Sequence, residues 1–174
     1  MTRLSSLTMI IIADFIDYVK DGVHFITGDE EGFCPVCHQL MKKCGRCRRY
    51  VRGKYGKRDE LAVRVLYCRN CKHHHRELPD FVVPHKHFGA EVFAAVCDAL
   101  GNYFIDDHSA SRMLRWVKAF FKLGLATVRR LKLEHPTLVT KYNADSTLDT
   151  LRYFVMLVVN AGEWRTTSSC ILSG

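Results

Sequence analysis

The 174-residue sequence has no apolar run long enough to span a membrane. Two apolar runs, at residues 7–13 and 153–159, fall well short of the roughly 20 residues that a transmembrane helix needs. The first run ends at Asp14 without a small-residue cleavage site, so we do not expect a secretory signal peptide. We therefore expect a cytosolic protein with reduced cysteines and no membrane partner.

Acidic residues are nearly absent from residues 33–76, which hold five Lys and eight Arg but only Asp59 and Glu60. That segment carries a formal charge of +11, and since the whole chain carries +8, the remainder carries −3. A basic patch confined to one module is typical of proteins that bind nucleic acids. A solvated basic surface that only promotes solubility has the same composition and is the alternative.

The cysteines include two pairs with Cys-x-x-Cys spacing, Cys34 with Cys37 and Cys68 with Cys71, separated by 30 residues. Each pair favours a tight turn, or knuckle, that directs two sulfurs to one point, and four thiolates bind a structural Zn²⁺ tetrahedrally. The intervening residues suffice for the strands of a zinc ribbon. We predict one structural zinc ion on these four cysteines, because disulfides would require a secreted chain.

A third Cys-x-x-Cys pair, Cys44 and Cys47, lies inside the most basic stretch of the sequence. These residues could form a second metal half-site or compete with the outer pairs, or they could be ordinary small residues of a hairpin. Only Cys97, Cys170 and the histidines remain to complete a second site, and none has knuckle spacing. We therefore leave Cys44 and Cys47 out of the predicted site.

Residue patterns in the first half predict mainly strands. Apolar and β-branched residues predict strands at 8–12 and 62–67, and we expect a short helix at 14–19. Because four cysteines already fill the zinc tetrahedron, we expect His73, His74 and His75 at the surface, facing phosphate or solvent. Pro79 and Pro84 lie at the two ends of residues 79–84, which predicts an extended linker.

The enzymatic alternative is a nuclease of the His-Asn-His kind, which is also built around paired Cys-x-x-Cys turns. Such an enzyme needs a helix with further polar ligands after its catalytic histidine. The proline-bounded segment that follows His75 does not predict one. We therefore do not expect an enzyme.

The second half changes to helical periodicity. Apolar spacing predicts a helix at 92–100, a second helix that starts near Ser109 or Ser111 as N-cap, and a short separate segment at 127–133. A last helix is expected at 147–160, with Ser146 capping its start. The first two helices and their connection at 102–108 favour a helix-turn-helix, since the second helix has an apolar face opposite a basic one.

These patterns predict two groups of nucleic-acid-binding residues. Phosphate contacts are expected from the basic hairpin, through Arg46, Arg48, Arg49, Arg52, Lys54, Lys57 and Arg58. The second group lies on the expected recognition helix, where Arg112 and Arg115 are the candidates for reading base edges and Lys118 lies beside them.

Several motifs together carry a family resemblance: the strand at 8–12, the Cys-Pro-x-Cys and Tyr-Cys-x-x-Cys turns, Leu-Pro-Asp-Phe at 78–81 and Arg-Trp at 115–116. The sequence resembles an uncharacterised bacterial domain family found in Firmicutes and linked to mobile elements. Its zinc ribbon is similar to those at the N-termini of insertion-sequence transposases. The resemblance covers roughly residues 8–122 and implies that Cys44 and Cys47 are not ligands. We expect this chain to lack the RNase-H-like catalytic domain of such transposases.

We therefore predict an α+β protein, in which a small β zinc ribbon is followed by an all-α domain of the helix-turn-helix kind. The predicted domains are residues 1–88 and 89–165, with a flexible tail at 166–174. The predicted function is DNA binding, as an accessory protein or regulator of a mobile element, with zinc as cofactor. The alternative is a zinc-stabilised adaptor that binds a transposase or another protein.

Overall fold

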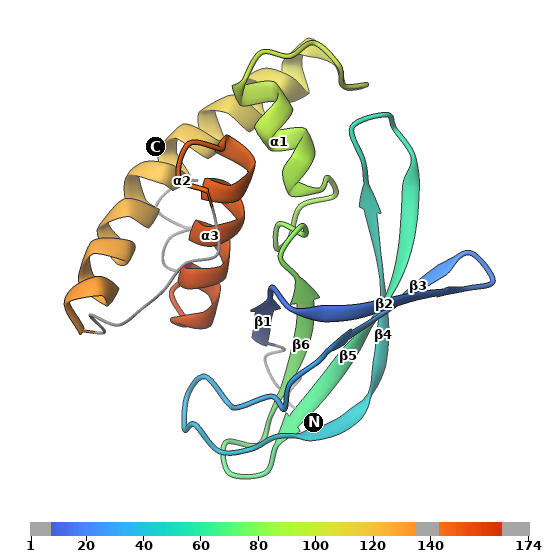
Figure 1. Cartoon of the computed structure of the whole chain (residues 1–174), viewed down its shortest axis with the longest axis vertical. Coiled ribbons are helices and arrows are strands. Elements are labelled where there is room, and N and C mark those ends of the chain that lie inside the picture. Colours follow the sequence, from blue (N-terminus) through green and yellow to red (C-terminus); the bar gives the residue numbers. More distant parts are fainter. Residues whose placement is uncertain (1–7, 135–142, 165–174) are drawn as a thin grey trace, which may run out of the picture. The chain divides into compact units, whose positions relative to one another are not determined.

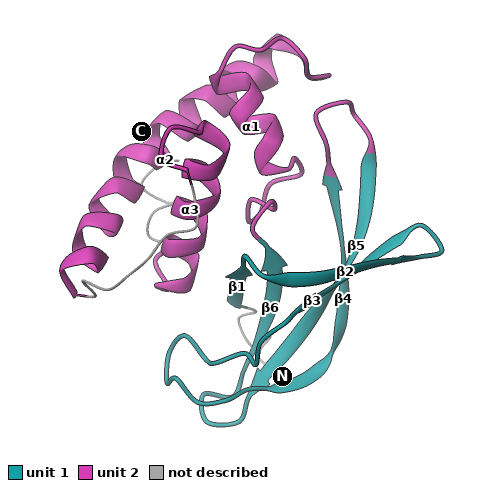
Figure 2. Ribbon diagram, in the orientation of Figure 1, with its two compact units in different colours: residues 1–51, 58–79 teal, residues 52–57, 80–174 magenta. Residues whose placement is uncertain are grey.

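The structure is a computed structural model of the chain, and it describes residues 8–134 and 143–164. This described part is mixed α/β, with a curled β-sheet and three helices (Figure 1). Figure 2 shows two compact units: unit 1 is residues 1–51 and 58–79, and unit 2 is residues 52–57 and 80–174. The division at residues 79 and 80 differs from the expected boundary at residue 88. The expected tail at 166–174 lies outside the described residues.

Unit 1 contains one sheet with strands in the order β1-β6-β5-β3-β2, and β4 also pairs with β5. β1 is parallel to β6 and β3 to β5, whereas β2 with β3 and β5 with β6 are antiparallel. β5 pairs with β3 through residues 60–63 and with β6 through residues 65–68. The strands are β1 (Thr8–Ile12), β2 (Phe15–Lys20), β3 (Val23–Gly28), β4 (Lys42–Arg52), β5 (Arg58–Cys68) and β6 (His73–Pro79).

The short helix expected at 14–19 is wrong, because these residues form β2. Asp21 and Gly22 both have positive φ, at 51° and 77°, and Lys20 pairs with Val23. A two-residue loop with positive φ at both positions suits the right-handed twist of a hairpin, and Asp-Gly is a favoured sequence for it. The turn therefore directs β2 into a hairpin with β3.

The expected linker at 79–84 is buried rather than free. Val82 and Val83 are fully buried, and Asp80 is only 1% exposed. The Asp80 carboxylate accepts a hydrogen bond from the Arg152 guanidinium at 2.6 Å. Because buried charges need partners, this ion pair accounts for an acidic side chain inside unit 2.

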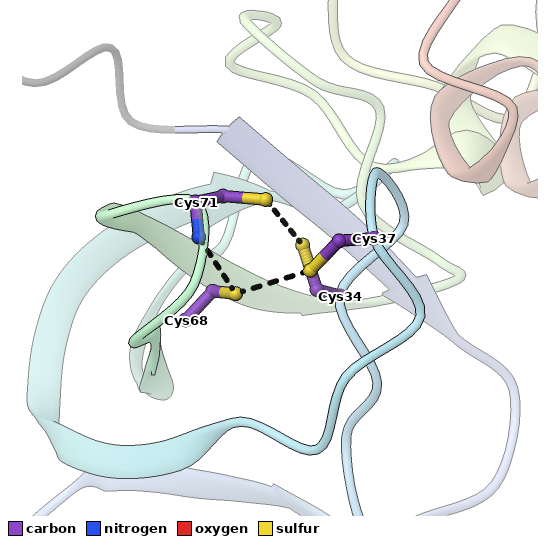
Figure 3. A group of neighbouring side chains, drawn as sticks. All are labelled: Cys34, Cys37, Cys68 and Cys71. Atoms are coloured by element: carbon purple, nitrogen blue, oxygen red, sulfur yellow. Dashed lines mark hydrogen bonds between the residues drawn. The ribbon is translucent and has the colours of Figure 1, made fainter.

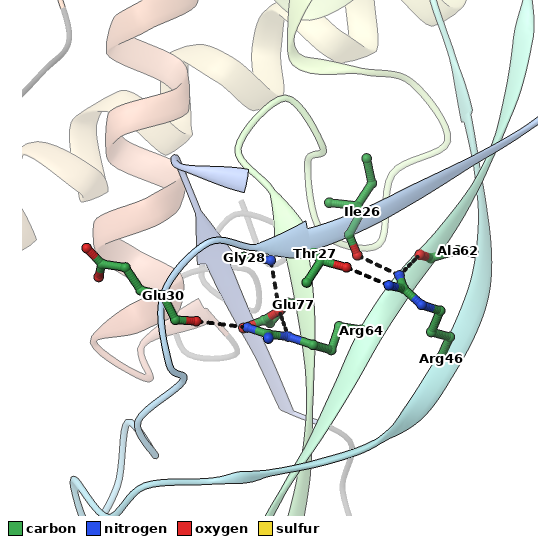
Figure 4. A network of polar contacts seen from close by, with 8 residues as sticks. All are labelled: Ile26, Thr27, Gly28, Glu30, Arg46, Ala62, Arg64 and Glu77. Carbon is green, nitrogen blue, oxygen red and sulfur yellow. Dashed lines mark hydrogen bonds and ion pairs between the residues drawn. The ribbon is translucent and has the colours of Figure 1, made fainter. Parts of the chain in front are cut away.

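Two arginines hold strands of the sheet together (Figure 4). Arg64 on β5 forms a bidentate ion pair with Glu77 on β6, with N–O distances of 2.5 and 2.7 Å. Glu77 is 2% exposed. Arg46 on β4 donates to the carbonyls of Ile26 and Ala62, each at 2.8 Å. Both arginines therefore satisfy acceptors inside the curled sheet, as buried polar groups require.

Unit 2 contains α1 (Ala90–Cys97), α2 (Asp107–Glu134) and α3 (Thr147–Asn160). The α3 prediction at 147–160 is confirmed, and the Ser146 hydroxyl accepts a hydrogen bond from the Asp149 amide at 3.2 Å. The core includes Trp116, which stacks on Phe120 with ring centres 4.9 Å apart. Gly124 of α2 lies against the ring of Phe154 on α3, so the absence of a side chain permits this close approach.

Two expectations for α2 are wrong. The separate segment at 127–133 is part of this one helix. The start is capped by Asp106 rather than by Ser109 or Ser111, since the Asp106 carboxylate accepts from the Ser109 amide at 2.8 Å and from its hydroxyl at 2.7 Å. These hydrogen bonds lower the pKa of Asp106. Neither α2 nor any other helix at residues 8–134 or 143–164 combines the length and apolarity needed to cross a membrane.

Candidate metal centre

The two outer Cys-x-x-Cys pairs form knuckles with the same backbone geometry. The first follows β3, and the second connects β5 to β6. In the first, His38 has φ of 57° and its amide donates to the Cys34 carbonyl at 2.8 Å. In the second, Lys72 has φ of 59° and its amide donates to the Cys68 carbonyl at 2.9 Å. In each knuckle a left-handed residue after the second cysteine closes the turn, so the two sulfurs point to one side.

The four sulfurs of these knuckles point toward one another (Figure 3). All lie within 4.8 Å of each other, with Cys34 and Cys71 Sγ at 3.8 Å and Cys37 and Cys68 Sγ at 3.5 Å. Tetrahedral coordination with Zn–S bonds of about 2.3 Å requires sulfurs about 3.8 Å apart. The cluster therefore fits a tetrahedral structural metal site. It is the one group of three or more potential ligands in the described segments, and Cys44 and Cys47 are not part of it.

The surroundings of the sulfurs divide the thiols by acidity. Hydrogen bonds from the Asn70 side chain and the Gln39 backbone lower the pKa of Cys37 to about 6. The hydrogen bond with Cys37, followed by burial, raises the pKa of Cys71 to about 12, and burial raises that of Cys34. Without metal, Cys37 therefore ionises more readily than Cys34 and Cys71, which retain their protons. A bound cation must displace those protons, so metal affinity increases with pH.

His75 lies directly behind the cysteines, and the expectation that it faces the surface is wrong. It is fully buried, and its Nε2 is 3.7 Å from Cys34 Sγ. Its Nδ1 is hydrogen bonded to the hydroxyl of Thr8 on β1. Burial lowers the pKa of His75, which favours the neutral ring. With one proton on the ring, Nε2–H can donate to Cys34 while Nδ1 accepts from Thr8.

Strand periodicity was the signal that could have identified His75. Side chains alternate between the two faces of a strand, so His73, His75 and Glu77 share one face of β6. Both His75 and Glu77 are buried, whereas Cys34 lies 41 residues away in sequence. The pattern therefore indicates a buried histidine, but only the fold shows that it contacts a cysteine.

The predicted phosphate-binding residues of the hairpin formed by β4 and β5 have different surroundings. Arg46 is bonded within the sheet, and Arg49 is partly buried with its pKa lowered by burial and by Arg76. Arg48 is exposed but pairs with Glu60. The remaining four lie at or near the hairpin tip, and all except the half-buried Lys54 are exposed: Arg52, Lys54, Lys57 and Arg58.

The predicted residues of the second helix all lie on α2. Arg112, Arg115 and Lys118 are exposed, while Val117 and Phe120 on the same helix are buried. This placement agrees with the amphipathic periodicity expected from the sequence. The connection from α1 to α2 spans residues 98–106, which is longer than the three to four or so residues of a helix-turn-helix turn.

The fold and the cysteine cluster together define a mixed α/β protein with a candidate structural metal site. Residues 34–116 match a domain of unknown function, DUF6431. The match starts at the first cysteine of the cluster and extends through α1 into α2, so it contains all four candidate ligands. No curated protein matches the chain, and no solved structure matches it either.

Proposed function

We propose that this protein binds DNA, with the cations of the β4–β5 hairpin contacting phosphates and a structural zinc ion stabilising the sheet that carries them. The observation that supports this proposal best is the composition of the hairpin surface. Exposed cations there alternate with exposed aromatic rings, and such rings can stack on bases or sugars.

Two of these cations lie over aromatic rings. The Arg58 guanidinium lies 3.7 Å from the centre of the Tyr50 ring, and Lys54 Nζ lies 5.2 Å from that of Tyr55. Tyr50 and Tyr55 are 45% and 64% exposed. Cation–π contacts reduce the freedom of long side chains and leave their charge available to phosphate. Arg46 is left out of the proposed surface because its donors are used inside the sheet.

Zinc is the metal proposed for the cluster. Four thiolates are soft ligands in a tetrahedral arrangement, which suits zinc better than calcium or magnesium. A site with four protein ligands has no open coordination position, so its role is to hold the two knuckles together. One knuckle follows β3 and the other joins β5 to β6, so a bound ion would clamp these parts of unit 1.

The exposed cations of α2 extend the proposal to a second element. Arg112, Arg115 and Lys118 add positive charge, and Arg115 is the candidate for reading a base edge. The long connection before α2 gives no support to a helix-turn-helix, so we propose only a basic helix. The resemblance to mobile-element proteins suggests an accessory or regulatory role for this DNA binding.

Fluorescence anisotropy with a random DNA duplex at two salt concentrations tests the proposal. We expect steep salt dependence, because each phosphate contact adds about 0.9 to the slope of log K against log salt. Lys57→Glu should weaken binding and lower this slope. Lys20→Glu, at an exposed site in the β2–β3 hairpin, is the matched control and should have a smaller effect. Equal effects of the two variants would contradict the proposed surface.

A protein adaptor is the second candidate, and one observation favours it. β2 is at the end of the sheet, and it exposes three large apolar side chains, Ile16, Tyr18 and Val19. Edge strands of this kind can pair with a strand of another protein. Val19→Lys should then abolish partner binding and leave DNA affinity unchanged or higher. A protein that shows no DNA binding at low salt would favour the adaptor.

A further inference from the structure

Unit 2 contains a groove of about 800 Å³ between α2 and residues 85–88. α2 contributes residues three or four apart, so one stripe of the helix forms a wall that includes Arg112, Trp116, Ala119 and Leu123. The volume lies in the range of ligand sites, which is roughly 300–1,000 Å³. The groove therefore has the size of a binding site and belongs to one compact unit.

The opposite wall is anchored to the tip of the β4–β5 hairpin. The Arg52 amide donates to the His87 carbonyl at 2.8 Å, and the Gly89 amide donates to the Arg52 carbonyl at 3.0 Å. These bonds fix the backbone on both sides of Phe88, which lines the groove. The hairpin tip and this wall are therefore neighbouring parts of one surface.

The lining of the groove is strongly basic. Four of its side chains are Lys or Arg, two are histidines, and none of the described residues that line it is acidic. The cations come from both walls, Lys86 from one and Arg112, Arg115 and Lys122 from the other. Such a concentration of one charge favours an anionic ligand.

Lys86 is held over an aromatic cluster. Its Nζ lies 4.8 Å from the centre of the Trp116 ring, and Trp116 stacks on Phe120. Burial and the charge of Arg112 lower the pKa of Lys86. An anion near Lys86 and Arg112 would offset their repulsion. Phe88 and Leu123 add apolar surface, which suits the planar base of a nucleotide better than inorganic phosphate.

The distance covered by the basic side chains of α2 favours a nucleic-acid strand over a single nucleotide as the ligand. Arg112 and Lys122 are ten residues apart, which corresponds to about 15 Å along a helix. Phosphates of a stacked strand repeat about every 3.4 Å along its axis, so about four nucleotides cover this distance. A mononucleotide reaches only part of it.

The second wall argues against a duplex at this face. The major groove of DNA is about 12 Å wide, and an α-helix alone has a diameter of about 10–12 Å. The Arg112 stripe of α2 is flanked by residues 85–88, so helix and wall together exceed the width of that groove. A single strand meets no such restriction.

We propose that the groove between α2 and residues 85–88 binds a single strand of nucleic acid. Lys86, Arg112 and Lys122 contact phosphates, Arg115 reaches the edge of a base, and one or two unpaired bases lie against Phe88 and Leu123. This inference rests on the DNA-binding function proposed above and adds a site for unpaired nucleotides to it. The hairpin cations bind duplex phosphates, and the neighbouring groove receives the unwound or protruding strand.

Anisotropy with the full-length protein and a labelled oligothymidine of about eight nucleotides tests the inference, since known single-strand sites span about 4–16 nucleotides. Lys86→Ala and Arg112→Ala should each weaken strand binding by about tenfold, the effect of losing one charged hydrogen bond. Lys132→Ala, an exposed lysine of α2 outside the groove, should change it by less than about twofold. Circular dichroism of each variant checks that α2 remains folded.

Three further results complete the test. A random duplex should lose less affinity than the single strand in both groove variants, because the hairpin supplies most of its phosphate contacts. Free thymidine monophosphate should compete only weakly. If it binds as tightly as the oligothymidine, the proposal of a single-strand site is wrong. If the protein binds duplex but Lys86→Ala and Arg112→Ala do not change its affinity for the single strand, the inference alone fails. If neither duplex nor strand binds at low salt, the proposed DNA-binding function itself fails.

Discussion

His75 makes a prediction that connects the buried core of unit 1 to the candidate metal centre. Its Nε2 lies 3.7 Å from Cys34 Sγ, and its Nδ1 is bonded to Thr8. Replacing His75 by Leu keeps much of the side-chain volume but removes the donor to sulfur. Replacing it by Gln keeps a donor at a similar distance from the backbone. The pair of variants therefore separates hydrogen bonding from packing.

The magnitude follows from the two hydrogen bonds that the leucine cannot make. Outer groups that bond to metal ligands typically contribute 10- to 100-fold, or about 1.4–2.7 kcal/mol, to metal affinity. His75→Leu also removes the ring partner of the Thr8 hydroxyl, which keeps its hydrogen bond to the His74 carbonyl at 3.4 Å, so we expect a cost of about 0.5–1.5 kcal/mol of folding stability, that of one hydrogen bond. We expect His75→Leu to lose metal affinity by about 10- to 100-fold. His75→Gln should recover part of that loss.

Competition with a chromophoric chelator measures the zinc affinity, and cobalt substitution reports the geometry through its visible absorption. His74→Leu is the position control, because His74 packs against the Tyr67 ring with centres 4.8 Å apart instead of facing a sulfur. Thermal unfolding of the metal-free proteins measures how much each substitution changes folding stability, so that this change can be separated from the change in zinc affinity. His75→Leu with the zinc affinity of the original protein, or with the same loss as His74→Leu, would refute the proposed role of the contact.

Three other predictions concern metal and packing. Removing zinc with a chelator should lower the unfolding temperature of unit 1, as differential scanning fluorimetry would detect. Cys68→Ser should make that temperature insensitive to added zinc. If added zinc raises the unfolding temperature of Cys68→Ser as much as that of the original protein, Cys68 is not a ligand. Glu77→Gln leaves Arg64 in a largely buried position without a charged partner, so chemical denaturation should show a loss of about 3–5 kcal/mol; a loss below about 1 kcal/mol would mean that solvent already screens the pair. Gly124→Ala places a Cβ 2.7 Å from the Phe154 ring, so overpacking of about 1–3 kcal/mol should exceed the helix-propensity gain of about 1 kcal/mol; greater stability in urea denaturation would contradict this.

Local patterns in the sequence predicted several elements correctly. The strand at 8–12, the strand that leads to Cys68 and the helix at 147–160 are confirmed. Spacing alone identified three Cys-x-x-Cys pairs, because such a turn is formed by neighbouring residues. The outer two pairs were preferred to Cys44 and Cys47 because no other residues with knuckle spacing remained to complete a second site. The Asp21-Gly22 hairpin was also readable from local sequence, and the helix expected there was wrong because that turn signal was overlooked.

Long-range contacts could not be read in this way. Arg46 bonds to carbonyls of β3 and β5, and Arg64 pairs with Glu77 of β6, so their roles depend on which strands become neighbours. A basic residue looks the same in sequence whether its partner is phosphate or a backbone carbonyl. The same applies to His75, whose partner Cys34 is set by the parallel and antiparallel pairing of the sheet.

The sequence by itself determined the four candidate ligands, the basic hairpin and the basic face of α2. The tertiary structure alone decided that the sulfurs of Cys34 and Cys71 lie 3.8 Å apart, that His75 lies behind them and that residues 85–88 lie opposite Arg112. The physical reason is that turns and helix faces depend on residues within about one turn of each other. A metal site or groove depends on which distant segments the fold packs together.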